Sequence, residues 1–258
     1  ALFTGDGVNG KDITSALNAP DLFMLWDRAN SYSLFPQWYT KLAGSKHMIS
    51  NSTNAEVQGN ALQGVFTQTG IQYATSGADT NSNVGSVNYD NFAFKRAPSF
   101  FDVVCYTGTG SNRTVTHNLG VTPELMLVKR RDDGVYAGRV YHKDVGSNYW
   151  LYLFYSGSDA AAQGPNSGVW NGAPTSTYFN VGTDNGVNAS GSATIAWLFA
   201  SCPGVSKVGT FTANGTDQVI NCGFTSGARF IMYKQTDGVG GWFVYDSARG
   251  ITGSPDPF

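Results

Sequence analysis

The chain has 258 residues, of which 13% are charged and 14% aromatic, and its formal net charge is −2. Folded domains carry roughly 25% charged residues and disordered chains lack aromatic side chains, so the composition favours a folded protein with an uncharged polar surface. The basic cluster Lys129, Arg130 and Arg131 is too small to support nucleic-acid binding. No apolar run approaches the roughly 18 residues of a membrane-spanning helix, so we expect no membrane insertion.

The three cysteines, Cys105, Cys202 and Cys222, have none of the spacings of a metal site. We expect them to be small buried residues of a protein that folds in a reducing cytoplasm. The sequence therefore predicts no metal and no cofactor.

Three short phrases recur along the chain, and each is followed by a dense apolar run. The phrases are "FTGDG" (Phe3–Gly7), "YTGTG" (Tyr106–Gly110) and "FTANG" (Phe211–Gly215). The runs contain Leu22, Leu125 and Phe230, which lie 103 and 105 residues apart, as the phrases do. Repeats at a constant offset indicate repeated structural units. We therefore expect Phe3, Tyr106 and Phe211 to open matching strands, and Leu22, Leu125 and Phe230 to be buried.

Two further matches support these units, and they align Asp21 with Glu124 and Arg229. "WYTK" (Trp38–Lys41) matches "VYHK" (Val140–Lys143) and "VYDS" (Val244–Ser247), and "NFAFKRAP" (Asn91–Pro98) matches "AWLFASCP" (Ala196–Pro203). We predict a first, diverged unit at 1–104, a second at 105–209 and a half unit at 210–258. The half unit would continue into further chain or pack on a neighbour.

The predicted elements, in chain order, are mostly strands. Residues 12–17 are the one stretch in which we expect a turn of helix. The runs at Leu22–Leu25 and Leu125–Val128 are apolar at every position, so both faces should be covered. Val115, His117 and Leu119 alternate on one strand face, and the segments Arg130–Gly134 and Thr236–Gly241 read as hairpin turns.

Two more strands are predicted in the second unit. Tyr149–Tyr155 is the most aromatic one, and Ala193–Phe199 closes the unit after a long polar insert, Ser156–Thr177. Six or seven strands per unit predict an all-β protein of tandem β-sandwich-like modules, with an internal repeat of about 104 residues and very little helix.

Several segments resemble a repeated β-rich domain of tail-fibre and other virion proteins of marine bacteriophages, especially those that infect cyanobacteria. They include "VTHNLGVTPELMLVKRRD", "VYHKDVG" and "WFVYDSARGI", and the resemblance covers about Tyr106–Ile251. The first copy is more diverged, with an insert around Asn51–Gly85. The resemblance implies a phage particle and contact with a bacterial surface or with neighbouring virion proteins. The resemblance implies no catalytic residues.

No catalytic constellation stands out from the residues themselves. Asp132 and Asp133 are the tightest carboxylate pair, but they lie in a predicted turn beside two arginines, so we expect a turn-forming role. A catalytic triad needs a Ser or Cys nucleophile beside the histidine, and no nucleophile motif stands out in the sequence. We therefore expect His117 to be a hydrogen-bonded structural residue. The loops Asp184–Gly186 and Asp79–Asn83 lack the regular spacing of a calcium loop, and whether they bind Ca²⁺ is left open.

Glycan binding is the chemistry that the composition favours, because sugars pack on aromatic rings and hydrogen-bond to Asn, Asp and hydroxyl groups. The candidate glycan-binding residues are Trp150, Tyr152, Tyr155 and Trp170, around the polar insert of the second unit. Period two places Trp150 and Tyr152 on one face of their strand and Tyr155 on the other, so one set should be core. We expect Trp38 and Trp242 to form core or unit-to-unit contacts.

These observations predict a non-enzymatic virion structural protein, a tail fibre or receptor-contacting module that binds host surface glycan or neighbouring virion proteins. The alternatives are a surface-polysaccharide depolymerase and a capsid decoration protein. The expected location is the phage particle, assembled in the bacterial cytoplasm. The expected partners are the chain itself, as a homotrimer, other virion proteins and host cell-surface polysaccharide.

Overall fold

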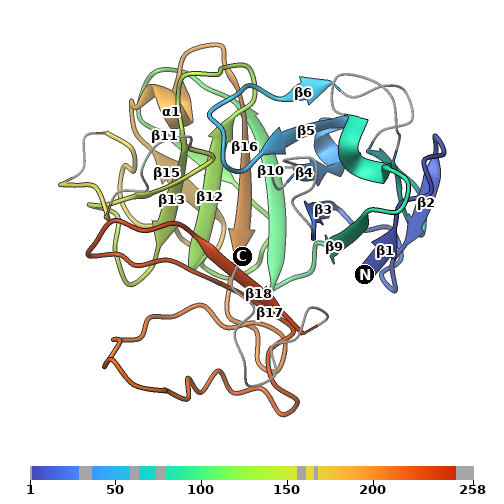
Figure 1. Ribbon diagram of the computed structural model, residues 1–258. Helices are drawn as coiled ribbons and strands as arrows, with labels where there is room; N and C mark the ends of the chain where they lie inside the picture. The colour runs from blue at the N-terminus through green and yellow to red at the C-terminus, as the bar shows by residue number, and fades with distance from the viewer. Residues whose placement is uncertain are drawn as a thin grey trace.

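The computed structural model describes residues 2–28, 37–58, 64–73, 80–155, 161–165 and 168–247. Strands make up 39% of the structure and helices 4%. Several antiparallel sheets form the body of the molecule (Figure 1), which confirms the expected all-β, sandwich-like class.

The first large sheet has six antiparallel strands in the order β1-β9-β3-β4-β5-β6. Their bounds are β1 (Leu2–Thr4), β9 (Asn88–Phe94), β3 (Leu22–Asp27), β4 (Gln37–Thr40), β5 (Lys46–Ile49) and β6 (Val57–Gln58). The outermost pairing joins the start of the unit to its end, because Phe3 in β1 lies opposite Tyr89 in β9.

The second large sheet has five antiparallel strands in the order β10-β16-β12-β13-β14. Their bounds are β10 (Phe101–Thr107), β16 (Ala193–Phe199), β12 (Leu125–Arg130), β13 (Gly138–His142) and β14 (Leu151–Leu153). The closing strand has the predicted bounds. β10 spans the division expected between residues 104 and 105 and pairs only within this second sheet in the described part of the chain.

Five strands of each large sheet follow the same spatial order when they are matched by sequence. β1, β9, β3, β4 and β5 correspond in this way to β10, β16, β12, β13 and β14. The central pairings also match: Leu22 lies between Phe94 and Thr40, and Leu125 lies between Phe199 and His142. The internal repeat stays a prediction, and the shared strand order supports it.

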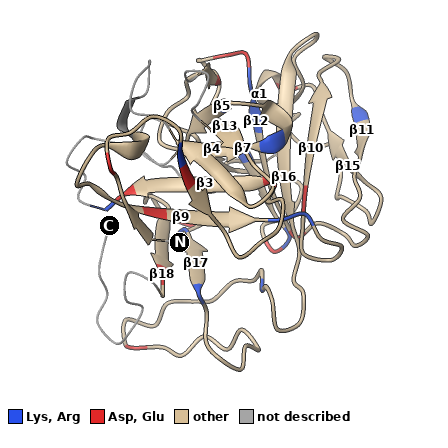
Figure 2. Cartoon of the chain, turned by 90° about the vertical axis from the view of Figure 1, so that its right-hand side faces the viewer, with Lys and Arg blue, Asp and Glu red and all other residues tan. Residues whose placement is uncertain are grey.

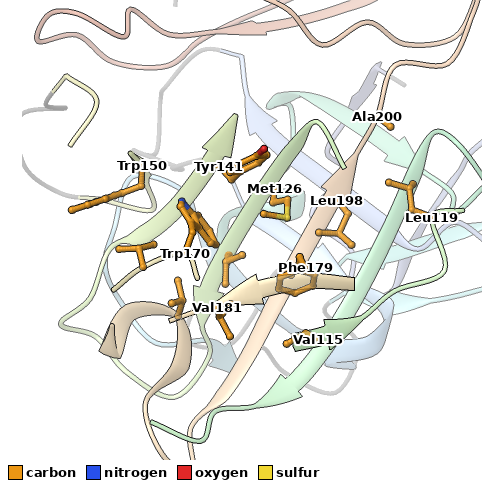
Figure 3. Packing of buried hydrophobic residues seen from close by; sticks show 14 residues of the cluster. Val115, Leu119, Met126, Tyr141, Trp150, Trp170, Phe179, Val181, Leu198 and Ala200 are labelled. Carbon is orange, nitrogen blue, oxygen red and sulfur yellow. The ribbon is translucent and has the colours of Figure 1, made fainter. Parts of the chain in front are cut away.

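A small sheet covers the outer face of each large one. β2 (Lys11–Thr14), β8 (Gly70–Tyr73) and β7 (Val65–Phe66) form the first in the order β2-β8-β7, and β11 (Arg113–Thr116) pairs with β15 (Tyr178–Val181) in the second. Ile13 and Ile71 pack with Phe23 beneath the first small sheet. Val115 and Phe179 of the second small sheet pack with Met126 of β12 in the same way (Figure 3).

The inner faces of the two large sheets share one hydrophobic core. Leu22 and Met24 of β3 contribute to it, whereas Phe23 and Leu25 point to the outer core under the small sheet. In the second sheet Leu127 joins the shared core while its neighbours in β12 pack outward. Both apolar runs are therefore covered on two faces, as predicted, and the two large sheets share an interior.

The half unit supplies one hairpin, β17 (Phe230–Tyr233) and β18 (Phe243–Asp246), which lies across the lower side of the body in Figure 1. Phe230 and Trp242 pack against the shared core. Phe211 was expected to open a matching strand, but no strand includes it, and every residue from 209 to 221 is exposed. The third copy of the opening phrase therefore lacks the strand partner that β9 and β16 give the first two.

Three local predictions need correction. Residues 12–17 form the end of strand β2 and a bend, not a helical turn. The aromatic strand predicted at Tyr149–Tyr155 is reduced to Leu151–Leu153. It ends there because Phe154 takes a φ of 57°, which breaks the extended backbone, and on the other side Trp150 forms only an isolated bridge with Gln163. Leu125 and Phe230 are half-buried, whereas Leu22 is fully buried as expected.

The regular helical segments lie between strands. They are the 3₁₀ turns Lys41–Ala43 and Thr80–Asn83, together with α1 (Asn185–Asn188). Asp184 caps α1 by accepting a hydrogen bond from the Gly186 amide at 2.8 Å, so this loop is a capped turn whose carboxylate is already engaged.

Candidate functional site

Two of the four predicted glycan-binding residues lie in the interior. Trp170 is 1% exposed and Trp150 is 8% exposed, and both belong to the core under β11 and β15 (Figure 3). The Trp170 indole N–H donates to the Tyr149 carbonyl at 3.1 Å. Both rings are therefore packed in the core, where little of either is accessible to a ligand.

The other two, Tyr152 and Tyr155, are half-buried and stacked on each other with their centroids 5.2 Å apart. The Arg139 guanidinium lies over the Tyr152 ring at 4.9 Å, and Trp242 donates its N–H to the Tyr152 carbonyl at 2.7 Å. The ring of Tyr152 is therefore engaged within the chain. Glycan binding at Tyr152 and Tyr155 stays a prediction.

The carboxylates and the histidine that the sequence analysis considered for catalysis have structural partners. Asp133 accepts the Tyr136 amide at 3.3 Å and pairs with Arg130, which confirms its role in the turn. His117 Nδ1 accepts from the Leu119 amide at 3.2 Å, and Nε2 lies 3.1 Å from the Thr175 carbonyl, so Nε2 carries the proton. Burial lowers the pKa of His117, against a smaller opposing effect of the Thr175 carbonyl.

An open cleft at the junction of the two units is the candidate functional site. It has a volume of about 390 Å³ and takes residues from both units. Its lining residues are Ala19, Asp21, Lys41, Lys95, Arg96, Ala97, Pro98, Phe101, Asp102 and Asn118. Charged residues are sparse along the ribbon in Figure 2 and make up 13% of the chain, whereas five of the ten residues that line the cleft are charged.

The strand pairing places three of these charges in a row. Thr40 and Phe94 lie on either side of Leu22, so the preceding residue, Asp21, is flanked by the residues that follow β4 and β9. Backbone hydrogen bonds fix this row: the Lys41 amide donates to the Asp21 carbonyl at 2.9 Å, and the Asp21 amide donates to the Phe94 carbonyl at 2.8 Å. Lys41 and Lys95 therefore flank Asp21 at the mouth of the cleft.

The two carboxylates of the cleft are buried, at 5% exposure for Asp21 and 4% for Asp102. One oxygen of Asp21 accepts the Arg96 amide at 2.9 Å, and the other accepts its guanidinium Nε at 3.1 Å. Asp102 accepts the Asn118 amide at 2.7 Å. The carboxylates thus hold the walls of the cleft together, as buried charges with hydrogen-bond partners do.

In the matching row of the second large sheet, the acidic and basic side chains pair with each other. Glu124 stands where Asp21 does, with the same two backbone hydrogen bonds, from Lys143 to Glu124 and from Glu124 to Phe199. Its side chain reaches the Lys143 ammonium at 3.1 Å and accepts from the amide and hydroxyl of Ser201. Burial would raise the pKa of Glu124, but the bonds from Ser201 and Lys143 lower it overall.

The ammonium groups of Lys41 and Lys95 differ in this respect from that of Lys143. Across the described residues, neither ammonium takes part in an ion pair, and Asp21 is occupied by Arg96. The sequence showed the match of Asp21 with Glu124 and of Lys41 with Lys143, but it could not show that the shorter Asp21 side chain bonds elsewhere. Asp102 carried no sequence signal at all.

In the part of the chain that the structure describes, no group of three or more His, Cys, Asp or Glu side chains is placed to hold a metal ion. Asp79 of the second Asp-rich loop lies outside the described residues. All three cysteines are free thiols and half-buried. None of the described helices has the length and apolar character needed to cross a membrane.

The fold and its cleft define an all-β module with a charged groove between two fused units. Residues 1–256 match the model of the family described as a domain of unknown function, DUF7483, and the chain belongs to that family. No curated protein and no solved structure matches the chain significantly.

Proposed function

We propose that this chain is a non-enzymatic structural module of a bacteriophage particle, a tail-fibre or receptor-contacting protein that binds host surface glycan. The sequence segments that resemble marine phage virion proteins support the particle as its location. The stacked sheets with a shared interior support a rigid building block. The protein would assemble with other virion proteins, and it would bind glycan without a cofactor.

The observation that carries the proposal is the state of the carboxylates in the cleft. A glycosidase needs one carboxylic acid to protonate the leaving oxygen and a second carboxylate to attack or to activate water. Both oxygens of Asp21 are already engaged by Arg96, and Asp102 is bonded to the Asn118 amide. These carboxylates are engaged in hydrogen bonds within the chain. The lysines beside them, which have no ion-pair partner among the described residues, can bind a ligand but do not supply the two carboxyl groups of a glycosidase.

The test measures binding and hydrolysis on the same polysaccharide. Envelope polysaccharide from marine cyanobacteria would be immobilised for binding and, in parallel, incubated with the protein to detect new reducing ends. We expect binding without new reducing ends. Position in the particle, determined by electron cryo-microscopy of intact phage, separates a tail fibre from a capsid decoration protein.

The depolymerase alternative has one observation in its favour, since Asp21 and Asp102 line the same cleft. It predicts that reducing ends appear and that they disappear in both Asp21→Asn and Asp102→Asn. Asp132→Asn is the matched control, because Asp132 is an exposed carboxylate in a turn. Release of reducing ends that survives the control and is lost in both cleft variants would replace the proposal by the alternative.

A further inference from the structure

We propose that the cleft beside Asp21 binds an acidic sugar, a glycan residue that carries a carboxylate, such as a hexuronate. The inference rests on the proposed function and names the ligand class that its glycan-binding site selects. The inference rests on three observations. Lys41 and Lys95 line the cleft without an ion-pair partner among the described residues, and Asp102 is a buried hydrogen-bond acceptor in its lining. In the matching row of the second large sheet, the lysine is paired with Glu124.

The free cations give the cleft its preference for a negative group. Lys41 and Lys95 flank Asp21 from the two neighbouring strand ends, and in the described part of the chain neither has an acidic partner. Arg96 adds a third exposed cation, of which only Nε is engaged by Asp21. Hydrogen bonds between ammonium groups and a carboxylate are among the stronger ones in proteins.

The corresponding row of the second large sheet has its acid paired with its lysine. There Glu124 reaches Lys143 at 3.1 Å, and the position of Lys95 is taken by Ala200. In the first unit the acid is one methylene shorter and its oxygens are held by Arg96, so the lysine is left available. The two units thus differ in the residues that set the charge of this row, while the backbone bonds are the same.

The floor of the cleft distinguishes a sugar from a bare anion. Asp102 is a buried group that, when ionised, can only accept hydrogen bonds, and it would repel a small anion such as phosphate. A uronate places its carboxylate toward the lysines and offers hydroxyl donors to Asp102. A volume of about 390 Å³ lies within the range of small-molecule sites and suits one or two sugar residues.

The experiment is a calorimetric titration of the whole chain with a galacturonate oligomer at low salt. The matched probe is the same oligomer with its carboxylates methyl-esterified, which keeps the hydroxyls and removes the charge. A third titration uses inorganic phosphate. We expect the acid to bind at least about 10-fold more tightly than the ester, with added salt weakening it, because the free energy comes from charge-assisted hydrogen bonds.

The variants are Lys41→Gln and Lys95→Gln, with Lys143→Gln as the control in the matching row. We expect each cleft variant to lose about 10-fold in affinity and the control to be unchanged. Asp21→Glu tests the comparison of the two units, since a longer acid that reaches Lys41 should weaken binding without removing any cation. Circular dichroism and the melting temperature show that each variant is folded.

Equal affinity for acid and ester, phosphate binding as tight as that of the uronate, or equal loss in the control would each overturn the inference. These outcomes are distinct from failure of the proposed function. That function fails if reducing ends are released through Asp21 and Asp102 or if the protein is absent from the particle, whatever the charge of the sugar that it binds.

Discussion

Trp197 in β16 donates its indole N–H to the hydroxyl of Thr40 in β4, at 3.0 Å, across the buried interface between the two large sheets. Both residues are at most 1% exposed. Around this bond the rings of Trp38 and Trp197 meet edge to face with centroids 5.2 Å apart. The contact joins residues 157 positions apart, so the two units are coupled through a polar bond inside an apolar layer.

Thr40→Val should therefore destabilise the whole chain. The substitution keeps the shape but leaves the Trp197 N–H buried without an acceptor, which costs about 1–3 kcal/mol. Urea unfolding followed by tryptophan fluorescence measures the loss. Thr116→Val is the control, because Thr116 is exposed in β11, and it should change stability by less than about 0.5 kcal/mol. Equal effects of the two variants would contradict the role of the bond.

Lys129 gives a prediction of pH dependence. Its ammonium is buried and donates to the carbonyls of Thr53, Asp133 and Tyr136 at 2.9–3.2 Å. Burial lowers the pKa of Lys129 to about 8, partly opposed by the Asp133 carboxylate. The unfolded lysine keeps its ordinary value, so between these values the unfolded state binds more protons. The contribution of Lys129 to stability therefore rises with pH from about 8 to 10.5.

The measurement compares wild type with Lys129→Met by urea unfolding at several pH values. The stability difference should shift in favour of wild type as pH rises through this window, with a slope of up to about 1.4 kcal/mol per pH unit. Lys207→Met, at an exposed lysine, should give a flat difference. A flat difference for Lys129→Met as well would mean that the three carbonyls hold its charge as firmly as water does.

The exposed segment before the last hairpin should be the first site of proteolysis. Residues 209–221 are all exposed, with Val219 at 98% and Ile220 at 46%. Thermolysin should cut there first, because a cleavable bond must leave the folded structure to enter a protease. Mass spectrometry identifies the fragments. Early cuts inside β12 or β16 would contradict the structure.

Phe230 should retain the hairpin after that cut. Its ring contacts Phe92 and Phe94, with centroids 5.1 and 5.8 Å apart. Phe230→Ala removes this packing and should speed release of the C-terminal fragment severalfold, since truncating a packed Phe costs roughly 3–5 kcal/mol when it is fully buried. Phe243→Ala is the control on the outer, 40% exposed side of the hairpin.

Self-association as a homotrimer remains a proposal, based on the low charge and the many aromatic residues. Light scattering after gel filtration should give three times the 27.5 kDa chain mass. Trp38 is 3% exposed within the shared core, so it is no subunit-contact residue, and variants there would report folding instead. A stable monomer across a wide dilution series would refute self-association.

The sequence predicted the elements whose pattern is local. Alternation, apolar runs and turn residues were sufficient for the closing strand Ala193–Phe199, for the two-faced burial of β3 and β12 and for the hairpin after Arg130. Such signals depend on neighbouring residues only. The strand predicted at Tyr149–Tyr155 is shorter than the pattern indicated. Phe154 has a positive φ, and its ring packs beside Trp38 and Trp197, residues distant in the sequence that no local pattern reveals.

The cleft could not be predicted, because it depends on contacts between distant segments. Asp102 lies in β10 of the second large sheet and Asn118 follows β11, whereas Asp21, Lys41 and Arg96 lie beside strands of the first large sheet. Alternation also left open which face of the aromatic strand was core, and it said nothing of Trp170, which lies outside that strand. Both Trp150 and Trp170, two of the glycan-binding candidates, are buried.

Each large sheet pairs the first strand of its unit with the last, Leu2 with Asp90 in one and Phe101 with Phe199 in the other. On a ribosome that adds about 5–20 residues per second, an opening strand waits on the order of 4–20 s before its partner is synthesised. During that time the apolar strands between them lack their central neighbour. The nascent chain is thus exposed to misassociation twice in each synthesis, and its yield in cells should depend on chaperones that shield unpaired strands.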